Sequence, residues 1–161
     1  MADQSDDVLT HIKALRAYAR SLCGNVPDAE DLMQETLLRA IEKADSYQPG
    51  TYMRAWLFTI MRNKFLTNIK KSARERTGAS DCASANPTVP ASQDWHMRHQ
   101  EMRAALAEMP LHYREAIVLV GVIGESYLNA AQILGCDIGT IKSRVHRARH
   151  ILRRALEPES D

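Results

Sequence analysis

The sequence predicts an all-α protein, made of two small helical domains joined by a flexible linker. Apolar residues recur at steps of three and four along most of the chain, which is typical of helices with one buried face. Aromatic residues make up only 6% of a chain that is 45% hydrophobic, so Leu, Ile, Ala and Met fill the core and favour helices. Small and polar residues dominate between about Ser72 and Asp94. We therefore place the domains at 1–72 and 94–161, and the linker at 73–93.

The first domain contains three predicted helices, which span Val8–Leu22, about Asp28–Ala44 and about Thr51–Lys71. The first carries a regular apolar stripe and ends near Gly24. Asp28 follows Pro27 and caps or opens the second helix, with Asp31 in its first turn. Pro and Gly in the segment 45–50 predict a loop before the third helix.

The second domain contains a helix around 95–109 and three further helices after it. The residues that cap or break these helices are, in chain order, Pro110, Gly121 with Gly124, Ser126, Gly135 and Asp137. The short helix Tyr127–Leu134, the turn at Gly135 and the long helix that Asp137 begins together form a predicted helix-turn-helix.

The last helix carries the strongest functional signal. Its predicted apolar stripe consists of Ile138, Ile141, Val145, Ala148 and Leu152. Its other sides carry Lys142, Arg144, Arg147, Arg149, Arg153 and Arg154. A helix that is anchored on one side and cationic elsewhere suits a DNA groove lined by phosphates. A solvated basic face is the alternative for an isolated helix, but the preceding short helix and turn favour DNA binding.

Two other charged segments leave their function open when taken alone. The bases between Arg62 and Arg76 alternate with Asn63, Phe65 and Asn68, a mixture that suits unstacked single-stranded DNA. A polar helix face leading into the linker is the preferred interpretation of that segment by itself. The acidic segment 28–40 suits a protein partner with a basic surface, but periodicity alone favours ordinary helix charge near an N-terminus.

Taken together, these segments resemble the bacterial extracytoplasmic-function (group 4) sigma factors. Residues 28–40, Asp-Ala-Glu-Asp-Leu-Met-Gln-Glu-Thr-Leu-Leu-Arg-Ala, resemble the region 2 signature of this family, and residues 54–63 resemble the second half of that region. Ser126–Ala131 and Gly139–Arg149 resemble region 4. The form Gly-Cys-Asp-Ile-Gly-Thr-Ile-Lys-Ser-Arg most resembles the alphaproteobacterial general-stress sigma factors and the sigma-like domain of their response regulator.

The resemblance implies roles for individual residues. One helix face would dock on the clamp helices of the polymerase β′ subunit, and the resemblance places on it Asp31, Gln34, Glu35 and Leu38. At the −10 element it would use the loop Asp45–Tyr52 with Trp56, Arg62, Asn63 and Lys64. At the −35 element, Lys142, His146 and Arg147 would contact bases, while Thr140, Ser143, Arg144 and Arg149 would lie on or near phosphates. For Trp56 and Phe58 a place in the core is favoured over a melting wedge.

The sequence departs from the family pattern around residues 121–129. The family usually carries acids near the positions of Ile123, Leu128 and Asn129. Glu125 stands where an apolar or aromatic residue is common. These changes affect the packing or the partner contacts of the helix that supports the DNA-reading helix.

No residue pattern indicates an enzyme, so we expect no catalytic residue, cofactor or metal. The six histidines lack metal-ligand spacing, and no phosphate-binding loop or nucleophile elbow is present. The three cysteines are unpaired in spacing, which fits a reducing cytoplasm. The first residues do not form a signal peptide, and no apolar run reaches the roughly 20 residues of a membrane span.

We therefore expect a cytoplasmic sigma factor that directs core RNA polymerase, through its β and β′ subunits, to specific promoter DNA. The resemblance further implies a stress response and control by an anti-sigma factor, without membrane insertion. Two alternatives remain at this stage. One is a sigma-like decoy that sequesters an anti-sigma factor, and the other is a stand-alone helix-turn-helix regulator.

Overall fold

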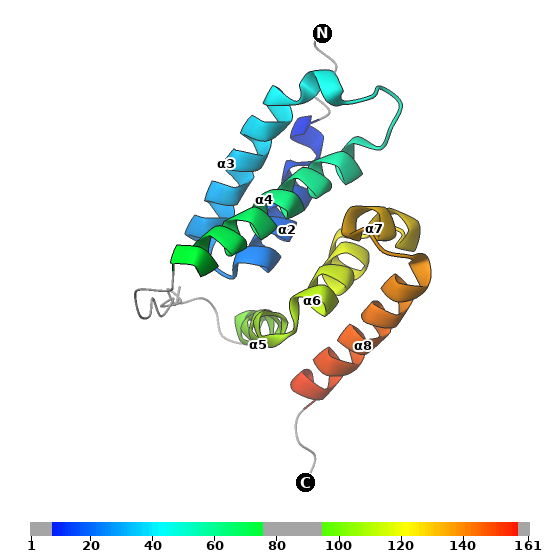
Figure 1. Ribbon diagram of the computed structural model, residues 1–161. Coiled ribbons are helices and arrows are strands. Elements are labelled where there is room, and N and C mark those ends of the chain that lie inside the picture. The colour runs from blue at the N-terminus through cyan, green and yellow to red at the C-terminus, as the bar shows by residue number, and fades with distance from the viewer. Residues whose placement is uncertain (1–7, 76–94, 158–161) are drawn as a thin grey trace. The chain divides into compact units, whose positions relative to one another are not determined.

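The computed structural model describes residues 8–75 and 95–157, which belong to two compact units (Figure 1). The N-terminal unit contains α2 (Ile12–Cys23), α3 (Val26–Glu42), the 3-10 turn η1 (Ala44–Ser46) and α4 (Met53–Glu75). The C-terminal unit contains α5 (Trp95–Glu108), α6 (Leu111–Ile117), the π-helical turn η3 (Val118–Ile123), α7 (Tyr127–Leu134) and α8 (Ile138–Leu156). All regular elements in the described ranges are helical, which confirms the predicted fold class. Most of the predicted linker lies outside these ranges.

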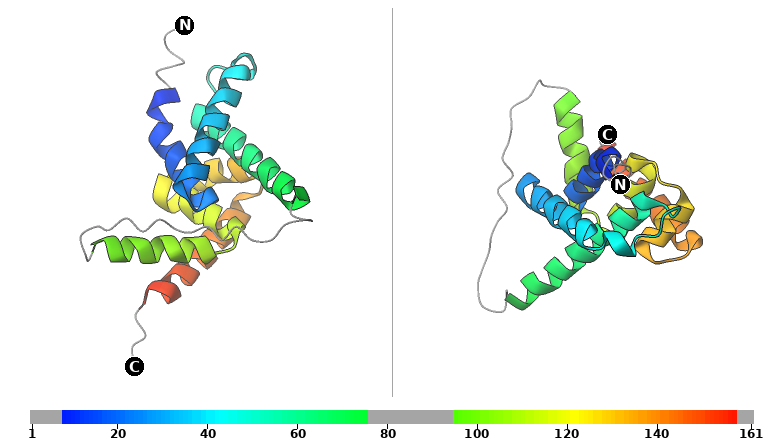
Figure 2. Two further views of the ribbon diagram at one scale, coloured as in Figure 1. Left: turned by 90° about the vertical axis from the view of Figure 1, so that its left-hand side faces the viewer. Right: turned by 90° about the horizontal axis from the view of Figure 1, so that it is seen from above.

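The core of the N-terminal unit forms where α2, α3 and α4 pack against one another, as the views in Figure 2 agree. Leu15 and Tyr18 of α2 and Leu57 and Phe58 of α4 are fully buried. The rings of Tyr18 and Phe58 meet edge to face, with centroids 5.2 Å apart. Phe58 is therefore a core residue.

Among the described residues, no helix has the length and apolar character that a bilayer crossing requires.

The start of α3 differs from the sequence prediction. Asn25, not Asp28, caps the helix, because its extended backbone allows its side-chain oxygen to accept a hydrogen bond from the Asp28 N–H at 2.9 Å. Pro27 lies in the first turn, where its missing N–H leaves no intrahelical bond unmade. Asp28 lies in the same turn, near the positive end of the helix dipole.

Cys23, the last residue of α2, lies close to the acidic side of α3. Burial raises the pKa of its thiol to about 11, and the charges of Asp28, Asp31 and Glu35 act in the same direction. At neutral pH the thiol therefore stays protonated and is a poor nucleophile.

The helix that begins after Pro110 ends differently from the prediction. It passes at Val118 into the π-helical turn η3, and Gly121 lies inside that turn. Gly124 ends the turn with a φ of 87°, a left-handed conformation that glycine adopts without strain. The prediction that both glycines end the helix is therefore wrong for Gly121. This residue lies inside the turn and does not adopt the left-handed conformation of Gly124.

The helix-turn-helix forms with its predicted boundaries. Ser126 caps α7 by accepting a hydrogen bond from the Asn129 N–H at 3.0 Å. Gly135 makes the turn with a φ of 66°. Asp137 occupies the N-cap position of α8, but its side chain forms no capping hydrogen bond there.

We predict that Ser126→Ala destabilises the C-terminal unit by about 1 kcal/mol, the usual contribution of a side-chain N-cap. Asp137→Ala is the matched control and should have a smaller effect, because this residue contributes charge but no capping bond. Denaturant unfolding followed by circular dichroism measures both free energies. Equal losses for the two variants would contradict the assigned caps.

We also predict that Cys23 reacts slowly with iodoacetamide in a variant carrying Cys82→Ser and Cys136→Ser. Its rate should rise about tenfold per pH unit until the pH approaches 11, because the thiolate is the reactive form. Adding Asp31→Asn should raise the rate at a fixed pH, since it removes one charge that opposes ionisation. A rate that levels off below pH 9 would refute this environment for Cys23.

Candidate nucleic-acid and protein interfaces

The apolar side of α8 anchors this helix in the C-terminal unit. Ile141, Val145 and Ala148 are at most 1% exposed and pack where α8 contacts α6 and α7. Ile138 is 38% exposed, so its predicted place in the buried stripe is wrong. It is the first residue of α8 and lies at the rim of a hollow that it shares with Leu128, which is also exposed.

The opposite side of α8 is solvent-exposed and basic. We call it the basic face, and it consists of Lys142, Ser143, His146, Arg147 and Arg149. Their helical spacing of three and four residues gives a continuous surface. Thr140 and Arg144, the two other residues predicted for the −35 element, are half-buried. The Arg144 guanidinium donates to the Cys136 sulfur at 3.9 Å, so this side chain is directed toward the turn of the helix-turn-helix.

Lys142 is also held by the helix that precedes the turn. Its ammonium group lies 5.9 Å from the centre of the Tyr127 ring, a cation–π contact between α8 and α7. This contact links the first residue of α7 to the basic face. Tyr127 was not predicted for this role, because the pairing depends on the angle between the two helices.

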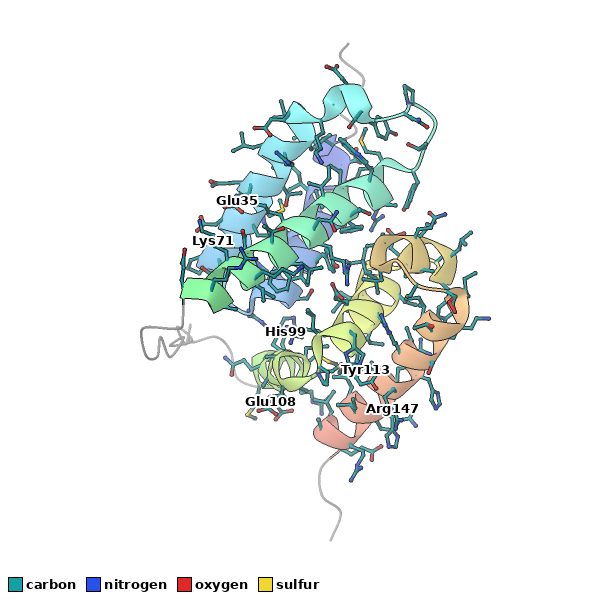
Figure 3. All side chains as sticks on the ribbon, in the orientation of Figure 1. Glu35, Lys71, His99, Glu108, Tyr113 and Arg147 are labelled. Atoms are coloured by element: carbon teal, nitrogen blue, oxygen red, sulfur yellow. The ribbon has the colours of Figure 1, made fainter. Side chains whose placement is uncertain are left out.

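Basic side chains continue beyond the residues predicted for the −35 element. Arg147, His150 and Arg154 line a shallow hollow together with Tyr113 of α6, and Figure 3 shows Tyr113 and Arg147 on these two helices. His150 and Arg154 were not among the predicted site residues. Their positions three and seven residues after Arg147 were the signal available in the sequence.

The predicted polymerase-binding residues lie together on α3. We call this surface the acidic face: Asp31, Gln34 and Leu38 are exposed, and Glu35 is half-buried. The surface also has an apolar component, because Leu38 is 62% exposed and Ile41 is 73% exposed. Ile41 was missed, although it lies outside the buried stripe of α3 and three residues after Leu38. Exposed apolar groups with polar residues around them are a feature of protein-binding surfaces.

Glu35 connects this surface to α4. One of its carboxylate oxygens accepts a hydrogen bond from the Asn68 side chain at 3.2 Å and lies 4.0 Å from the Lys64 ammonium group. Figure 3 marks Glu35 on α3, next to α4. The structure therefore joins a predicted polymerase-binding residue to a predicted DNA-binding residue. Asn68, four residues after Lys64 on the same helix, completes the contact and was not predicted for it.

The predicted −10 residues occupy the start and middle of α4. Trp56 is half-buried, and its ring lies against Tyr47, with centroids 5.1 Å apart. Asn63 is exposed, whereas Arg62 and Lys64 are half-buried. Trp56 is therefore less buried than Phe58, which is fully enclosed in the core.

The departures from the family pattern have distinct structural settings. Glu125 is buried and accepts a hydrogen bond from the Asn129 side chain at 3.2 Å. Leu128 and Val122 are 54% and 64% exposed, so this part of the C-terminal unit presents apolar rather than acidic groups. The carboxylate of Glu125 is thus turned inward, whereas the apolar side chains of Val122 and Leu128 face solvent.

Comparisons with known proteins identify the family of each unit. Residues 8–75 match the family Sigma-70 region 2, and residues 99–152 match the family Sigma-70, region 4. The ECF RNA polymerase sigma factor EcfG of Rhodopseudomonas palustris (strain TIE-1) is 49% identical over 144 residues, covering 89% of this chain and 80% of EcfG.

Two solved structures extend the similarity to the fold. The sigma factor RpoE from Bartonella quintana, in complex with the anti-sigma factor NepR, has a TM-score of 0.83 at 41% identity and covers 99% of this chain and 100% of that chain. CnrH, in complex with the cytosolic domain of CnrY, has a TM-score of 0.72 at 27% identity, with coverages of 97% and 88%. These similarities confirm the family expected from the sequence motifs. The chain belongs to the extracytoplasmic-function sigma factors, which direct core RNA polymerase to promoters, and it resembles their alphaproteobacterial general-stress type.

Proposed function

We propose that this sigma factor divides its two tasks between its two units. The acidic face of the N-terminal unit binds the β′ subunit of core polymerase, and the basic face of the C-terminal unit binds the −35 element. The observation that carries this proposal is the outward orientation of the basic face, which the buried residues Ile141, Val145 and Ala148 enforce. Contacts with the β subunit complete the docking.

Opposite charge and exposed apolar surface support a protein partner for the acidic face. DNA phosphates repel Asp31 and Glu35, whereas a basic protein surface attracts them. Leu38 and Ile41 add apolar area that a protein partner would bury. Docking also offers Glu35 a stronger partner than Lys64, whose contact at 4.0 Å is long and half-exposed.

The chemistry of α8 supports direct contact with DNA. Lys142 and Arg147 carry donors that pair with guanine acceptors in the major groove, and His146 lies between them along the helix. Arg149 and Ser143 reach phosphates from the flanks. Thr140 lies in the first turn of α8, where backbone N–H groups favour an anion.

The first part of α4 and the loop before it are assigned to the −10 element. Trp56 offers an aromatic surface, and Arg62, Asn63 and Lys64 offer cationic and amide groups about two helical turns further along. This combination suits bases that have left the duplex stack. Because Trp56 is half-buried, its ring is better suited to support the loop before α4 than to act as a wedge between bases.

Similarity to a sigma factor captured with an anti-sigma factor supports control by such an inhibitor. We assign the protein to a cytoplasmic stress response on the same basis, with EcfG as a relative. The exposed basic face favours a promoter-binding sigma factor over a decoy that only sequesters the inhibitor, because a decoy has no use for base-contacting side chains.

We predict that Lys142→Ala with Arg147→Ala lowers promoter-specific transcription at least tenfold while leaving affinity for core polymerase unchanged within about twofold. Each lost base contact removes about 1–3 kcal/mol of discrimination. Run-off transcription and fluorescence anisotropy measure the two quantities. Lys13→Ala, an exposed lysine on α2, is the control for lost charge.

Neutralising the acidic face should instead weaken the binding of core polymerase. Asp31→Asn with Glu35→Gln should weaken core polymerase binding about tenfold, because charge pairs across a protein interface contribute both attraction and orientation. Glu75→Gln, at the exposed end of α4, is the matched control. Unchanged binding of the double variant would reject this face as the polymerase contact.

An anti-sigma factor should bind the Lys142→Ala, Arg147→Ala variant as tightly as the unaltered protein, within about twofold. The reason is that the inhibitor recognises protein surfaces that do not depend on base-contacting donors. Co-purification from lysate followed by calorimetry tests this. A decoy would also retain inhibitor binding, but its unaltered form would show no promoter-specific transcription. Loss of inhibitor binding in the variant would contradict the prediction.

A further inference from the structure

The loop between η1 and α4 is held in one shape by hydrogen bonds of its own. The Tyr47 hydroxyl donates to the Thr51 carbonyl at 2.7 Å, across the turn at Pro49 and Gly50. The Thr51 hydroxyl donates in turn to the Gln48 carbonyl at 2.7 Å. Gly50 has a φ of 91°, which the turn requires and which other residues adopt only with strain. The loop thus has a defined local structure despite its exposure.

The Tyr47 ring ties this loop to α4. It lies against the Trp56 ring at a centroid distance of 5.1 Å and an interplanar angle of 47°. Tyr47 is half-buried, whereas residues 44–46 and 48–52 are exposed. One side chain therefore makes both connections, with its ring on the tryptophan and its hydroxyl on the loop backbone.

We propose that Tyr47 is a positioning residue for promoter opening, which holds the loop against Trp56 so that the loop meets the unpaired −10 strand already ordered. This inference rests on the proposed function, since it requires the N-terminal unit to bind melted DNA. Ordering a loop at the moment of binding costs conformational entropy and weakens the complex. A loop that is ordered beforehand avoids this loss.

A neighbouring side chain explains why the ordered loop favours binding of the unpaired strand. Tyr52, at the end of the loop, is 44% exposed and lies four residues before Trp56. Aromatic rings bind bases by stacking, and a base offers its face only after it has left the duplex. Tyr47 orders the loop that ends at this exposed ring. Its effect therefore concerns binding of the single strand, and it contributes little to the initial contact with duplex DNA.

The ring contact itself can be observed by fluorescence. The chain contains two tryptophans, so Trp95→Phe leaves Trp56 as the reporter. In that background, Tyr47→Ala should shift the Trp56 emission to longer wavelength, because its ring gains contact with water. Tyr47→Phe should leave the emission nearly unchanged, since the ring contact persists. An unshifted emission for Tyr47→Ala would contradict the contact on which the proposal depends.

The functional experiment compares three loop variants as complexes with core polymerase. Tyr47→Phe removes the hydroxyl bond and should weaken binding to a single-stranded −10 oligonucleotide about fivefold, the effect of one net hydrogen bond. Tyr47→Ala should weaken it about tenfold or more, because the ring contact is lost as well. Gly50→Ala strains the turn without touching either ring and should give a similar defect.

Gly24→Ala is the matched control for strain. Gly24 also has a positive φ, of 74°, and no atom within 4 Å of an added Cβ, but it ends α2 and lies outside the loop. Circular dichroism checks that each variant is folded. Permanganate reactivity of promoter thymines, measured in parallel, should fall with oligonucleotide binding in the loop variants and stay unchanged in the control.

The outcomes separate the two levels of the proposal. Loop variants that bind core polymerase normally but open promoters poorly support Tyr47 as a positioning residue. Folded Tyr47→Ala and Gly50→Ala variants that open promoters like the unaltered protein overturn it, and the proposed function stands. Failure of the unaltered protein to open any promoter with core polymerase overturns the proposed function, and the role of Tyr47 with it.

Discussion

Burial of the apolar side of α8 is the interaction on which the DNA-binding surface depends. Ile141 and Val145 are almost fully enclosed, and a buried aliphatic side chain of this size contributes about 1.5–3 kcal/mol. Because these anchors fix the rotation of the helix, Lys142 and Arg147 must face outward. Turning the helix would bury unpaired cations, which costs several kcal/mol. The packing of the core thus determines which side chains can reach DNA.

The near-neutral net charge of +1 conceals two surfaces of opposite character. Screening at physiological salt limits the reach of solvent-exposed charges to about 8 Å, so each surface attracts a partner of opposite charge only at close range. The contact of Glu35 with Lys64 and Asn68 lies within the N-terminal unit, where it links α3 and α4 directly. A half-exposed pair of this kind contributes at most about 1 kcal/mol, so either partner can exchange it for a stronger contact.

Helical periodicity and turn residues were sufficient to predict the fold class and the helix-turn-helix. Buried helix faces require regularly spaced apolar residues, and caps and turns require particular residue types, so both can be recognised in the sequence. Ser126 and Gly135 illustrate this. The cap at Asn25 was missed because Asp28 satisfies the same chemical preference, and only the backbone angles distinguish them. The contacts of Tyr47 with Trp56 and of Asn68 with Glu35 depend on how helices and loops pack, which no local pattern encodes.

Photo-crosslinking from two positions in one promoter complex tests the division of tasks most directly. A benzoylphenylalanine replaces Leu38 in one protein and Ser143 in another, and each is assembled with core polymerase on the same promoter. The account predicts that position 38 crosslinks to a polymerase subunit and that position 143 crosslinks to DNA in the −35 element. Crosslinks from position 143 to protein alone, together with none from position 38 to polymerase, would contradict it.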